Sequence, residues 1–336
     1  MAVLVVNAGS TSLKLHLVED EDSTPVESLG VECEAVVHRV VWGGNTLVAK
    51  AAWLVDDYVE DELERATPIA PLHNMPMLEA LRKARDAQPE VPHIAVMDSY
   101  FHRTIPPVAA VYALPELYRS GAEIARHGFH GLSVQWASER LRVPRLVVCH
   151  LGGGCSVSAV FEGRSADTTM GFTPLEGVPM ATRAGSIDPG ALLYLLRTSR
   201  ATLEELDHAL EYESGLLGLS GISGDVRDLE ASSDERAALA LDVFSYRVAG
   251  AVAGMACALG GLDGLVFTAG VGENSARVRA DVCARLAFLG VDLDLDANAA
   301  ARPDADVATA ASAVRVAVVP AREELVAARA ARALLR

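Results

Sequence analysis

Two segments of the chain share one pattern, and this repetition constrains the fold more than any other feature of the sequence. Residues 3–18 form an apolar run, a turn of Gly, Ser and Thr, and then an alternating apolar and polar run. Residues 145–160 repeat this order around three consecutive glycines. Each segment is typical of two strands joined by a tight turn. One such hairpin at the head of each half of the chain predicts an internally duplicated architecture.

The rest of the chain alternates between strand-like and helix-like stretches, which predicts an α/β fold with mixed sheets. The length of 336 residues suits two domains, and with 51% apolar residues each domain can bury its own core. Prolines predict a loop at 67–76, and glycines and serines predict another at 214–224. We expect helices at 56–66, 77–87, 133–141, 188–196, 203–210, 234–259, 275–289 and from 323. We expect strands at 91–97 and 314–319, and a strand that runs into a glycine turn over 264–274.

Composition excludes several functional classes. The net charge of −16 argues against a surface that coats nucleic acid. Five scattered cysteines without a CxxC pair indicate neither a disulfide framework nor a zinc site, so we expect small core residues in a reducing, cytoplasmic compartment. The chain starts with an apolar strand and no basic segment, which predicts no signal peptide. The uncharged stretch 248–262 is shorter than the ~20 residues of a membrane span and predicts a buried helix.

The two small-residue turns are candidate phosphate-binding elements. Such turns bring backbone N–H groups close to phosphate oxygens without obstruction by side chains. Either turn taken alone is equally compatible with a plain hairpin. The sequence contains no GxxxxGK[ST] loop and no GxGxxG stretch. Phosphate binding must therefore come from the two hairpins and from a third glycine turn, Gly270-Val-Gly272.

Polar residues gather where apolar strands end. Arg39 and Arg183 have small or apolar neighbours, Asp98 follows a predicted strand, and His130 lies between glycines and phenylalanine. Phosphoryl transfer needs donors that neutralise the phosphoryl oxygens and a carboxylate near the metal. A structural salt bridge explains each arginine equally well, and a hydrogen-bonded core histidine is the more common explanation of His130.

The sequence resembles the acetate kinase family. The resemblance rests on long words that occur in family order over nearly the whole chain. These words are Asn-Ala-Gly-Ser-Thr-Ser-Leu-Lys at 7–14, Ala-Pro-Leu-His-Asn at 70–74, Gly-Phe-His-Gly at 128–131, Met-Gly-Phe-Thr-Pro-Leu-Glu-Gly at 170–177, Thr-Arg-Ala-Gly-Ser-Ile-Asp-Pro at 182–189, Ser-Gly-Leu-Leu-Gly-Leu-Ser-Gly-Ile-Ser at 214–223, Phe-Thr-Ala-Gly-Val-Gly-Glu-Asn at 267–274 and Glu-Glu-Leu at 323–325.

The resemblance implies a fold, a reaction and partners. The fold is a pair of ribonuclease-H-like domains of the actin/hexokinase/Hsp70 superfamily with a cleft between them. The implied domains are 1–99 with the helix 323–336, shortened between 15 and 38, and 100–322. The implied reaction is reversible, direct in-line transfer of phosphoryl from ATP to acetate, with Mg²⁺ or alternatively Mn²⁺. The family also implies a cytoplasmic homodimer without nucleic-acid or membrane partners.

The resemblance further implies a role for each matching residue. The implied catalytic residues are Arg39, Asp98, His130 and Arg183. The implied acetate site comprises Arg39, Val41, Leu72, His73, Phe129 and Pro174, and Val41 favours acetate over propionate. The implied nucleotide site comprises Ser10, Ser12, Lys14, His150, Gly152, Gly153, Gly154, Asp225, Val226, Arg227, Gly270, Val271, Gly272, Glu273 and Asn274. The metal is assigned to Asn7 and Glu323.

The chain departs from the family pattern at several places. The stretch between Lys14 and Arg39 is several dozen residues shorter, enough to lose at least one helix. Glycine stands at 153 where the family has asparagine, and Trp42 and Val134 stand where it has histidine. Ala321 and Arg322 also differ from the family's Thr and Asp. Two alternatives to an acetate kinase therefore stay open: a propionate or other short-acyl kinase, and a catalytically weak nucleotide-binding relative.

Overall fold

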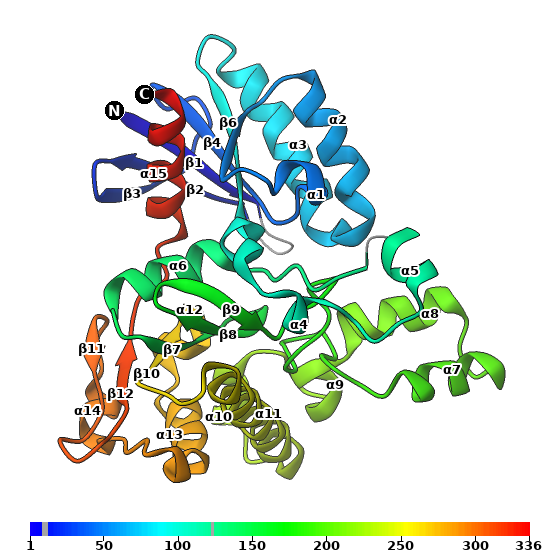
Figure 1. Ribbon diagram of the computed structural model, residues 1–336, viewed down its shortest axis with the longest axis vertical. Helices are drawn as coiled ribbons and strands as arrows, with labels where there is room; N and C mark the ends of the chain where they lie inside the picture. The colour runs from blue at the N-terminus through cyan, green and yellow to red at the C-terminus, as the bar shows by residue number, and fades with distance from the viewer. Residues whose placement is uncertain (9–12, 122–123) are drawn as a thin grey trace. The chain divides into compact units, whose positions relative to one another are not determined.

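The computed structural model describes residues 1–8, 13–121 and 124–336 (Figure 1). The chain divides into two compact units. The first contains Met1–Thr104, Phe129–Trp136 and Arg322–Arg336, and the second contains Ile105–Gly128 and Ala137–Ala321. Each unit is built around one six-stranded sheet.

The sheet of the first unit has the strand order β3-β2-β1-β4-β6-β5. Strands β1, β4 and β6 run parallel to one another, and β2, β3 and β5 pair antiparallel with their neighbours. The strands are β1 Ala2–Ala8, β2 Leu13–Glu19, β3 Asp22–Val26, β4 Ala35–Val40, β5 Ala52–Leu54 and β6 His93–Met97.

The sheet of the second unit has the order β9-β8-β7-β10-β12-β11. Here β7, β10 and β12 are parallel, and β8, β9 and β11 are antiparallel to their neighbours. The strands are β7 Arg145–Leu151, β8 Cys155–Phe161, β9 Arg164–Thr168, β10 Gly264–Thr268, β11 Ala305–Asp306 and β12 Arg315–Val318.

The two sheets correspond strand for strand in both order and direction. The predicted hairpins are β1–β2 and β7–β8, and each lies at the same place in its sheet. The duplicated α/β architecture expected from the sequence is therefore confirmed. Between Lys14 and Arg39 the chain forms strands β2 and β3 and the start of β4, with no helix, in agreement with the shortened segment.

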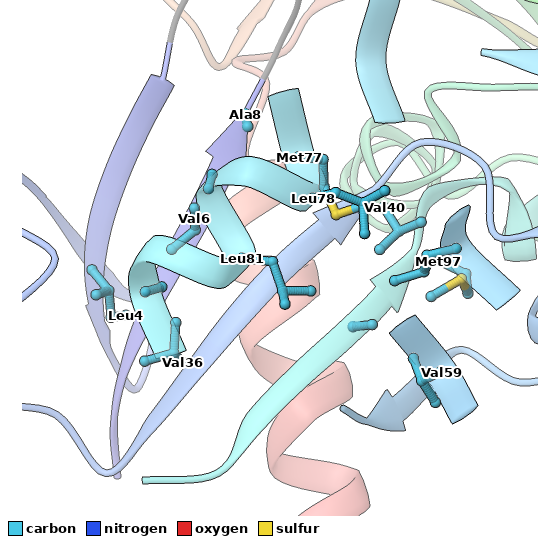
Figure 2. Packing of buried hydrophobic residues seen from close by; sticks show 14 of the residues in the cluster. Leu4, Val6, Ala8, Val36, Val40, Val59, Met77, Leu78, Leu81 and Met97 are labelled. Atoms are coloured by element: carbon cyan, nitrogen blue, oxygen red, sulfur yellow. The ribbon is translucent and has the colours of Figure 1, made fainter. Parts of the chain in front are cut away.

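The core of the first unit lies between its sheet and helices α2 and α3. Leu4 and Val6 of β1 and Val36 of β4 face Leu81 of α3, and all four side chains are buried (Figure 2). Helix α15, which ends near the C-terminus, also packs on this unit, against β1, β2 and β4 (Figure 1). The helices are α1 Gly44–Leu47, α2 Asp57–Ala66, α3 Pro71–Ala87 and α15 Glu323–Leu335, with 3₁₀ turns at Thr67–Ile69 and Asp98–Thr104.

The predicted loop at 67–76 is wrong. Residues Thr67–Ile69 form a 3₁₀ turn, and α3 begins at Pro71 and continues through Pro76. Pro71 fits because the first helical position needs no donor and proline already has a helical φ. Pro76 removes one backbone donor inside the helix. Burial of Met77, Leu81 and Ala84 against the sheet offsets that loss.

The second unit carries most of the helices. Among them α11 is 25 residues long, with Asp234 as its N-cap. By length and a mean hydropathy of 1.3 it could cross a membrane, but 44% of its apolar window is buried and it packs on β7, β8 and β9. It is thus the packed helix that the sequence predicts. The helices are α4 Pro107–Ala110, α5 Glu116–Gly121, α6 Gly131–Arg140 (which starts in the first unit), α7 Pro189–Arg197, α8 Leu203–His208, α9 Gly215–Ser220, α10 Val226–Ala231, α11 Glu235–Leu259, α12 Ala269–Asn274, α13 Ala276–Arg285 and α14 Leu295–Ala300.

Five further predictions need correction, four about helices and turns and one about the cysteines. The loop predicted at 214–224 contains α9, and the glycine turn predicted at 270–272 is the start of α12. The helix predicted to reach 210 passes into a π-helical turn at Ala209–Glu213, and the helix predicted to reach 289 ends at Arg285, before a 3₁₀ turn at Ala287–Leu289. Short helices rich in glycine lack the apolar periodicity that reveals longer ones. All five cysteines are free as expected, but Cys257 is exposed and Cys33 only partly buried, so they are not all core residues.

Candidate active site

A polar cluster lies at the carboxyl ends of the three parallel strands of the first sheet. Asn7 is near the end of β1, Arg39 near the end of β4, and Asp98 directly follows β6. The ends of parallel strands meet at one edge of a sheet, which is where α/β proteins bind ligands. Glu323 joins the cluster from the first turn of α15.

The Arg39 guanidinium is the centre of this cluster. Its Nη2 donates to Asp98 Oδ2 at 2.8 Å, and its Nη1 lies 3.0 Å from Glu323 Oε2. Nη1 also donates to Asn7 Oδ1 at 3.2 Å, and Asn7 Nδ2 donates to Glu323 at 3.1 Å. Arg39 Nε is buried and has no partner among the described residues. The guanidinium is therefore held rigidly while one buried donor stays unused.

The electrostatics of the cluster favour a permanent positive charge on Arg39. Burial alone would lower the pKa of Arg39, but the charges of Asp98 and Glu323 outweigh burial and raise it. Because the two carboxylates approach from different elements, they also fix the direction of the guanidinium plane.

Asp98 also positions His130. The side chain of Asp98 is fully buried and accepts hydrogen bonds from the backbone N–H groups of His130 at 2.9 Å and Leu132 at 3.0 Å. His130 has a left-handed φ of 58°, which is unusual for a residue with a side chain. The next residue must be Gly131, because a Cβ there would overlap the Asp98 carbonyl oxygen. Sequence reasoning found His130 and Asp98, and the structure brings them together.

The first unit contains every residue of the predicted acetate site except Pro174. The side chains of Val41 and Phe129 are both buried. Trp42 packs beside Phe129 with ring centroids 6.4 Å apart, and the fully buried Asn74 donates to the Trp42 carbonyl at 2.7 Å. His73 lies in the first turns of α3. The Leu72 side chain lies outside the described residues.

The second predicted arginine, Arg183, is buried in the second unit with only 7% of its surface exposed. Its Nη1 donates to the carbonyl of Pro174 at 2.9 Å, and the nearest carboxylate, Glu211, is 4.0 Å from Nε. Burial lowers the pKa of Arg183 and raises that of Glu211, so attraction between them does not offset desolvation. Arg183 is thus a buried cation with weak compensation from the protein, as expected of an anion site.

The two hairpin turns differ in what the structure describes. Ser10 and Ser12 lie outside the described residues, and Lys14 is exposed at the start of β2, paired with Asn7. In the second turn, His150 is the second-last residue of β7, and Gly152 N–H donates to the Gly154 carbonyl at 3.0 Å. A Cβ at Gly153 would meet nothing within 4 Å, so this turn is open.

The other predicted nucleotide residues lie at the start of α10 and within the short helix α12 of the same unit. Asp225 is the N-cap of α10 and pairs with the exposed Arg227 at 2.5 Å, whereas the Val226 side chain is buried. In α12, a Cβ at Gly270 would meet nothing within 4 Å, and Asn274 Nδ2 donates to the Gly270 carbonyl at 2.8 Å. The remaining predicted members of α12 are Val271, Gly272 and Glu273.

One oxygen of the Glu273 carboxylate, Oε1, accepts a hydrogen bond from Ala321 N–H at 2.9 Å. Among the described residues, no group of three His, Cys, Asp or Glu side chains is arranged to hold a metal ion. Both ends of the Asn7 amide are used within the Arg39 cluster, whereas Glu323 Oε1 accepts no hydrogen bond from the described part of the chain. This donor set fits a hard cation held by one carboxylate oxygen, phosphate and water, as is usual for Mg²⁺.

Sequence reasoning missed several residues that shape the site. Glu211, Asn74 and Gly131 have no distinctive local pattern, although the last two lie inside motifs quoted for the family resemblance. Tyr112 and Arg126 were also missed, and both contact the segment that carries Pro174, at Phe172 and Glu176. Their importance comes from contacts across 40 or more positions of the chain, which no short motif reports.

Comparison with known proteins identifies the family. A model of the acetokinase family matches residues 22–329. The chain belongs to the acetokinase family. It is 37% identical to a protein named acetate kinase from Thermoanaerobacterium thermosaccharolyticum, with 96% of each chain covered. It is 46% identical to the acetate kinase of Gloeobacter violaceus, over 87% of this chain and 75% of that protein.

Solved structures of the acetokinase family agree with the fold. The acetate kinase of Porphyromonas gingivalis superimposes with a TM-score of 0.89 at 30% identity and covers all of both chains. A propionate kinase from Francisella tularensis also gives 0.89, at 31% identity over 98% of both chains. The two-sheet fold expected from the family resemblance is therefore confirmed.

Proposed function

We propose that this acetokinase-family chain transfers the γ-phosphoryl group of ATP to acetate, giving acetyl phosphate and ADP, and catalyses the reverse reaction. The observation that carries this proposal is the buried Arg183 guanidinium, whose nearest carboxylate is 4.0 Å away. A phosphoryl or carboxylate group is the anion that such a cation would bind best. The names of the relatives supply the choice of acetate.

The reaction that we propose is a direct displacement. A carboxylate oxygen of acetate forms a bond to the γ-phosphorus while the bond to the β–γ bridging oxygen breaks, and its electron pair leaves with ADP. Arg39 would orient the carboxylate through its unused Nε, because Asp98 and Glu323 occupy the terminal nitrogens. Arg183 would neutralise the oxygens of the phosphoryl group.

The remaining residues would bind and position. His130, held through its backbone by Asp98, would donate to the phosphoryl group. Ser10, Ser12, Lys14, the glycines 152–154 with His150, and the starts of α10 and α12 would bind the nucleotide. Glu323 would hold Mg²⁺, which when bound shields the phosphate charges, and Asn7 would keep Glu323 in place.

The test is formation of acetyl phosphate, trapped as the hydroxamate, from acetate, ATP and Mg²⁺. We expect activity in the wild type, a fall of about 10³-fold in Arg183→Ala, and wild-type activity in Arg164→Ala. Arg164 is a matched control because it is an exposed arginine of the same unit. A wild type no more active than Arg183→Ala would overturn the proposal and favour a nucleotide-binding relative with weak catalysis.

Propionate is a second candidate substrate, because a solved relative with a TM-score of 0.89 is a propionate kinase. One methylene in an apolar pocket changes binding by ~1–3 kcal/mol, so we expect the enzyme to use propionate less efficiently than acetate. Steady-state rates with formate, acetate, propionate and butyrate measure this preference. A kcat/KM higher for propionate than for acetate would make propionate the proposed substrate.

We also propose that the protein is a cytoplasmic homodimer. All five cysteines are free, which fits a reducing compartment. Helix α7 has no buried residue although four leucines and one tyrosine follow one another at 192–196, and Leu193 and Tyr194 are each about half exposed. Next to it in the chain, Ile187 lines a pocket of about 1290 Å³ whose rim includes Phe288, which is 74% exposed. Exposed apolar surface of this kind fits a second copy of the chain.

A further inference from the structure

The carbonyl of Pro174 is the only close hydrogen-bond acceptor that the described residues offer to the Arg183 side chain. Its distance to Nη1 is 2.9 Å, against 4.0 Å between Nε and Glu211. Pro174 lies in the segment 170–180, which forms neither helix nor strand. The direction of the Arg183 guanidinium therefore depends on what holds this irregular segment in place.

Tyr112 holds the segment on one side of Pro174. Its hydroxyl oxygen accepts a hydrogen bond from the Phe172 N–H at 3.0 Å, and its O–H donates to Glu176 Oε2. Burial and the neighbouring Glu176 raise the pKa of Tyr112, so the phenol keeps its proton and stays a donor. One hydroxyl thus ties together positions on both sides of Pro174.

Arg126 closes the same arrangement from the second side. Its Nη2 lies 3.0 Å from Glu176 Oε1, and its Nη1 donates to the Thr168 carbonyl at 2.7 Å. Thr168 is the last residue of strand β9, so Arg126 connects Glu176 to the sheet. The guanidinium also lies over the Tyr112 ring, 5.7 Å from its centroid.

Glycine at 171 leaves the room that this arrangement needs. A Cβ at Gly171 would overlap both the Glu176 carboxylate and the Tyr112 hydroxyl. The Gly171 carbonyl also accepts from His127 N–H at 3.0 Å, which adds a backbone tie beside Arg126. Four contacts from the segment 110–128 therefore converge on the residues that flank Pro174.

We propose that Tyr112, Arg126 and Glu176 act as positioning residues that hold the Pro174 carbonyl and, through it, the Arg183 guanidinium. We call these three residues the Pro174 clamp. This inference rests on the proposed function, since it assigns the clamp to the anion that Arg183 binds. None of the three would touch the reacting atoms.

The test compares Tyr112→Phe with Tyr118→Phe, a matched change at an exposed tyrosine of the same segment. Loss of one hydrogen bond on each side of Pro174 should lower kcat/KM for acetate roughly tenfold, with the KM for ATP unchanged. Glu176→Gln should act on the same parameter. The double variant should be less impaired than the product of the two single effects, because both break one unit.

Amide hydrogen exchange gives a second measurement that does not depend on activity. We expect faster exchange of the Phe172 amide in Tyr112→Phe and no change in Tyr118→Phe. If the wild type makes no acetyl phosphate, the proposed function fails. The Pro174 clamp is then tested by the amide hydrogen exchange of Phe172 alone. Unchanged Phe172 exchange, or an unchanged kcat/KM for acetate in an active Tyr112→Phe enzyme, would overturn the inference.

Discussion

The Arg39 guanidinium donates to the carboxylate of Asp98 at 2.8 Å. Arg39 lies on β4, and Asp98 follows β6, the parallel strand beside it. The carboxylate is fully buried and also accepts the backbone N–H groups of His130 and Leu132. A single carboxylate therefore fixes an arginine side chain and the backbone of a histidine. Its charge is needed for both, because it accepts all three hydrogen bonds and donates none.

Asp98→Asn keeps the size of the side chain and removes its charge. We expect stability to fall by about 3–5 kcal/mol, because the buried Arg39 loses one of its two carboxylates. We expect kcat to fall about 10²-fold or more, as both Arg39 and His130 lose their fixed positions. Urea unfolding and the hydroxamate assay measure the two effects. Asp61→Asn, an exposed change on α2, should alter neither.

Glu323→Gln tests the proposed metal ligand. The amide keeps an oxygen but loses the charge that attracts the cation, so the Mg²⁺ concentration for half-maximal activity should rise about tenfold. The adjacent Glu324→Gln is the control, since Glu324 faces Arg322 at 3.6 Å. An identical Mg²⁺ activation curve for Glu323→Gln and the wild type would contradict the assignment.

Gly153→Asn restores the residue that the family resemblance leads us to expect. The site is open, because a Cβ at Gly153 would meet nothing within 4 Å. An added amide donor toward a phosphate should lower the KM for ATP about tenfold, because a hydrogen bond to a charged group contributes ~1.5–3 kcal/mol. Gly163→Asn, at another open glycine in the β8–β9 turn, should leave the KM unchanged.

The buried His38 and His102 and the partly buried His127 predict acid sensitivity. Burial lowers the pKa of His38 to about 3 and those of His102 and His127 to about 4. The unfolded chain binds their protons near pH 6.5, so stability is complete above that pH and is lost as the pH falls toward 4. Each histidine should lower the free energy of unfolding by about 2 kcal/mol between pH 7 and pH 5.

His102→Gln isolates one of these histidines. Glutamine can replace the contact between His102 Nε2 and the Phe129 carbonyl without binding a proton. Urea unfolding at pH 7 and pH 5 should show a smaller loss than in the wild type, by about 2 kcal/mol. The exposed His208→Gln should keep the full loss, and equal losses in all three proteins would refute the explanation.

Leu193→Asp tests the proposed dimer. A charge on the uncovered face of α7 should convert a dimer into a monomer, which light scattering after gel filtration would detect. Leu295→Asp provides the control, because Leu295 is 67% exposed on α14 in the same unit. A wild-type protein that elutes as a monomer would contradict the proposed dimer.

The sequence predicted the features of this fold that have local signals. Both hairpins and the long helix α11 follow from apolar periodicity and small-residue turns. The start of α3 could not be predicted, because proline is read as a helix breaker although burial of one helix face decides the outcome. The helical state of Gly270 and Gly272 was hidden for a similar reason, since glycine favours turns when its tertiary contacts are unknown.

Site residues divide in the same way. Asp98 stands out because it follows an apolar strand, and Arg39 and Arg183 stand out because charged residues are rare among small or apolar neighbours. The clamp residue Tyr112 does not stand out, because tyrosine is common in helical and loop surroundings alike. Its value arises from Phe172 and Glu176, 60 and 64 positions away in the chain.

The contact between Asn7 and Glu323 joins residues 316 positions apart. During synthesis the first sheet can form early, but Arg39 then has Asp98 alone as its carboxylate partner. Glu323 joins the cluster only when α15, which begins at this residue, has formed. A chain in which α15 has not yet formed could therefore fold most of the first unit and still lack one of the two carboxylates of the Arg39 cluster.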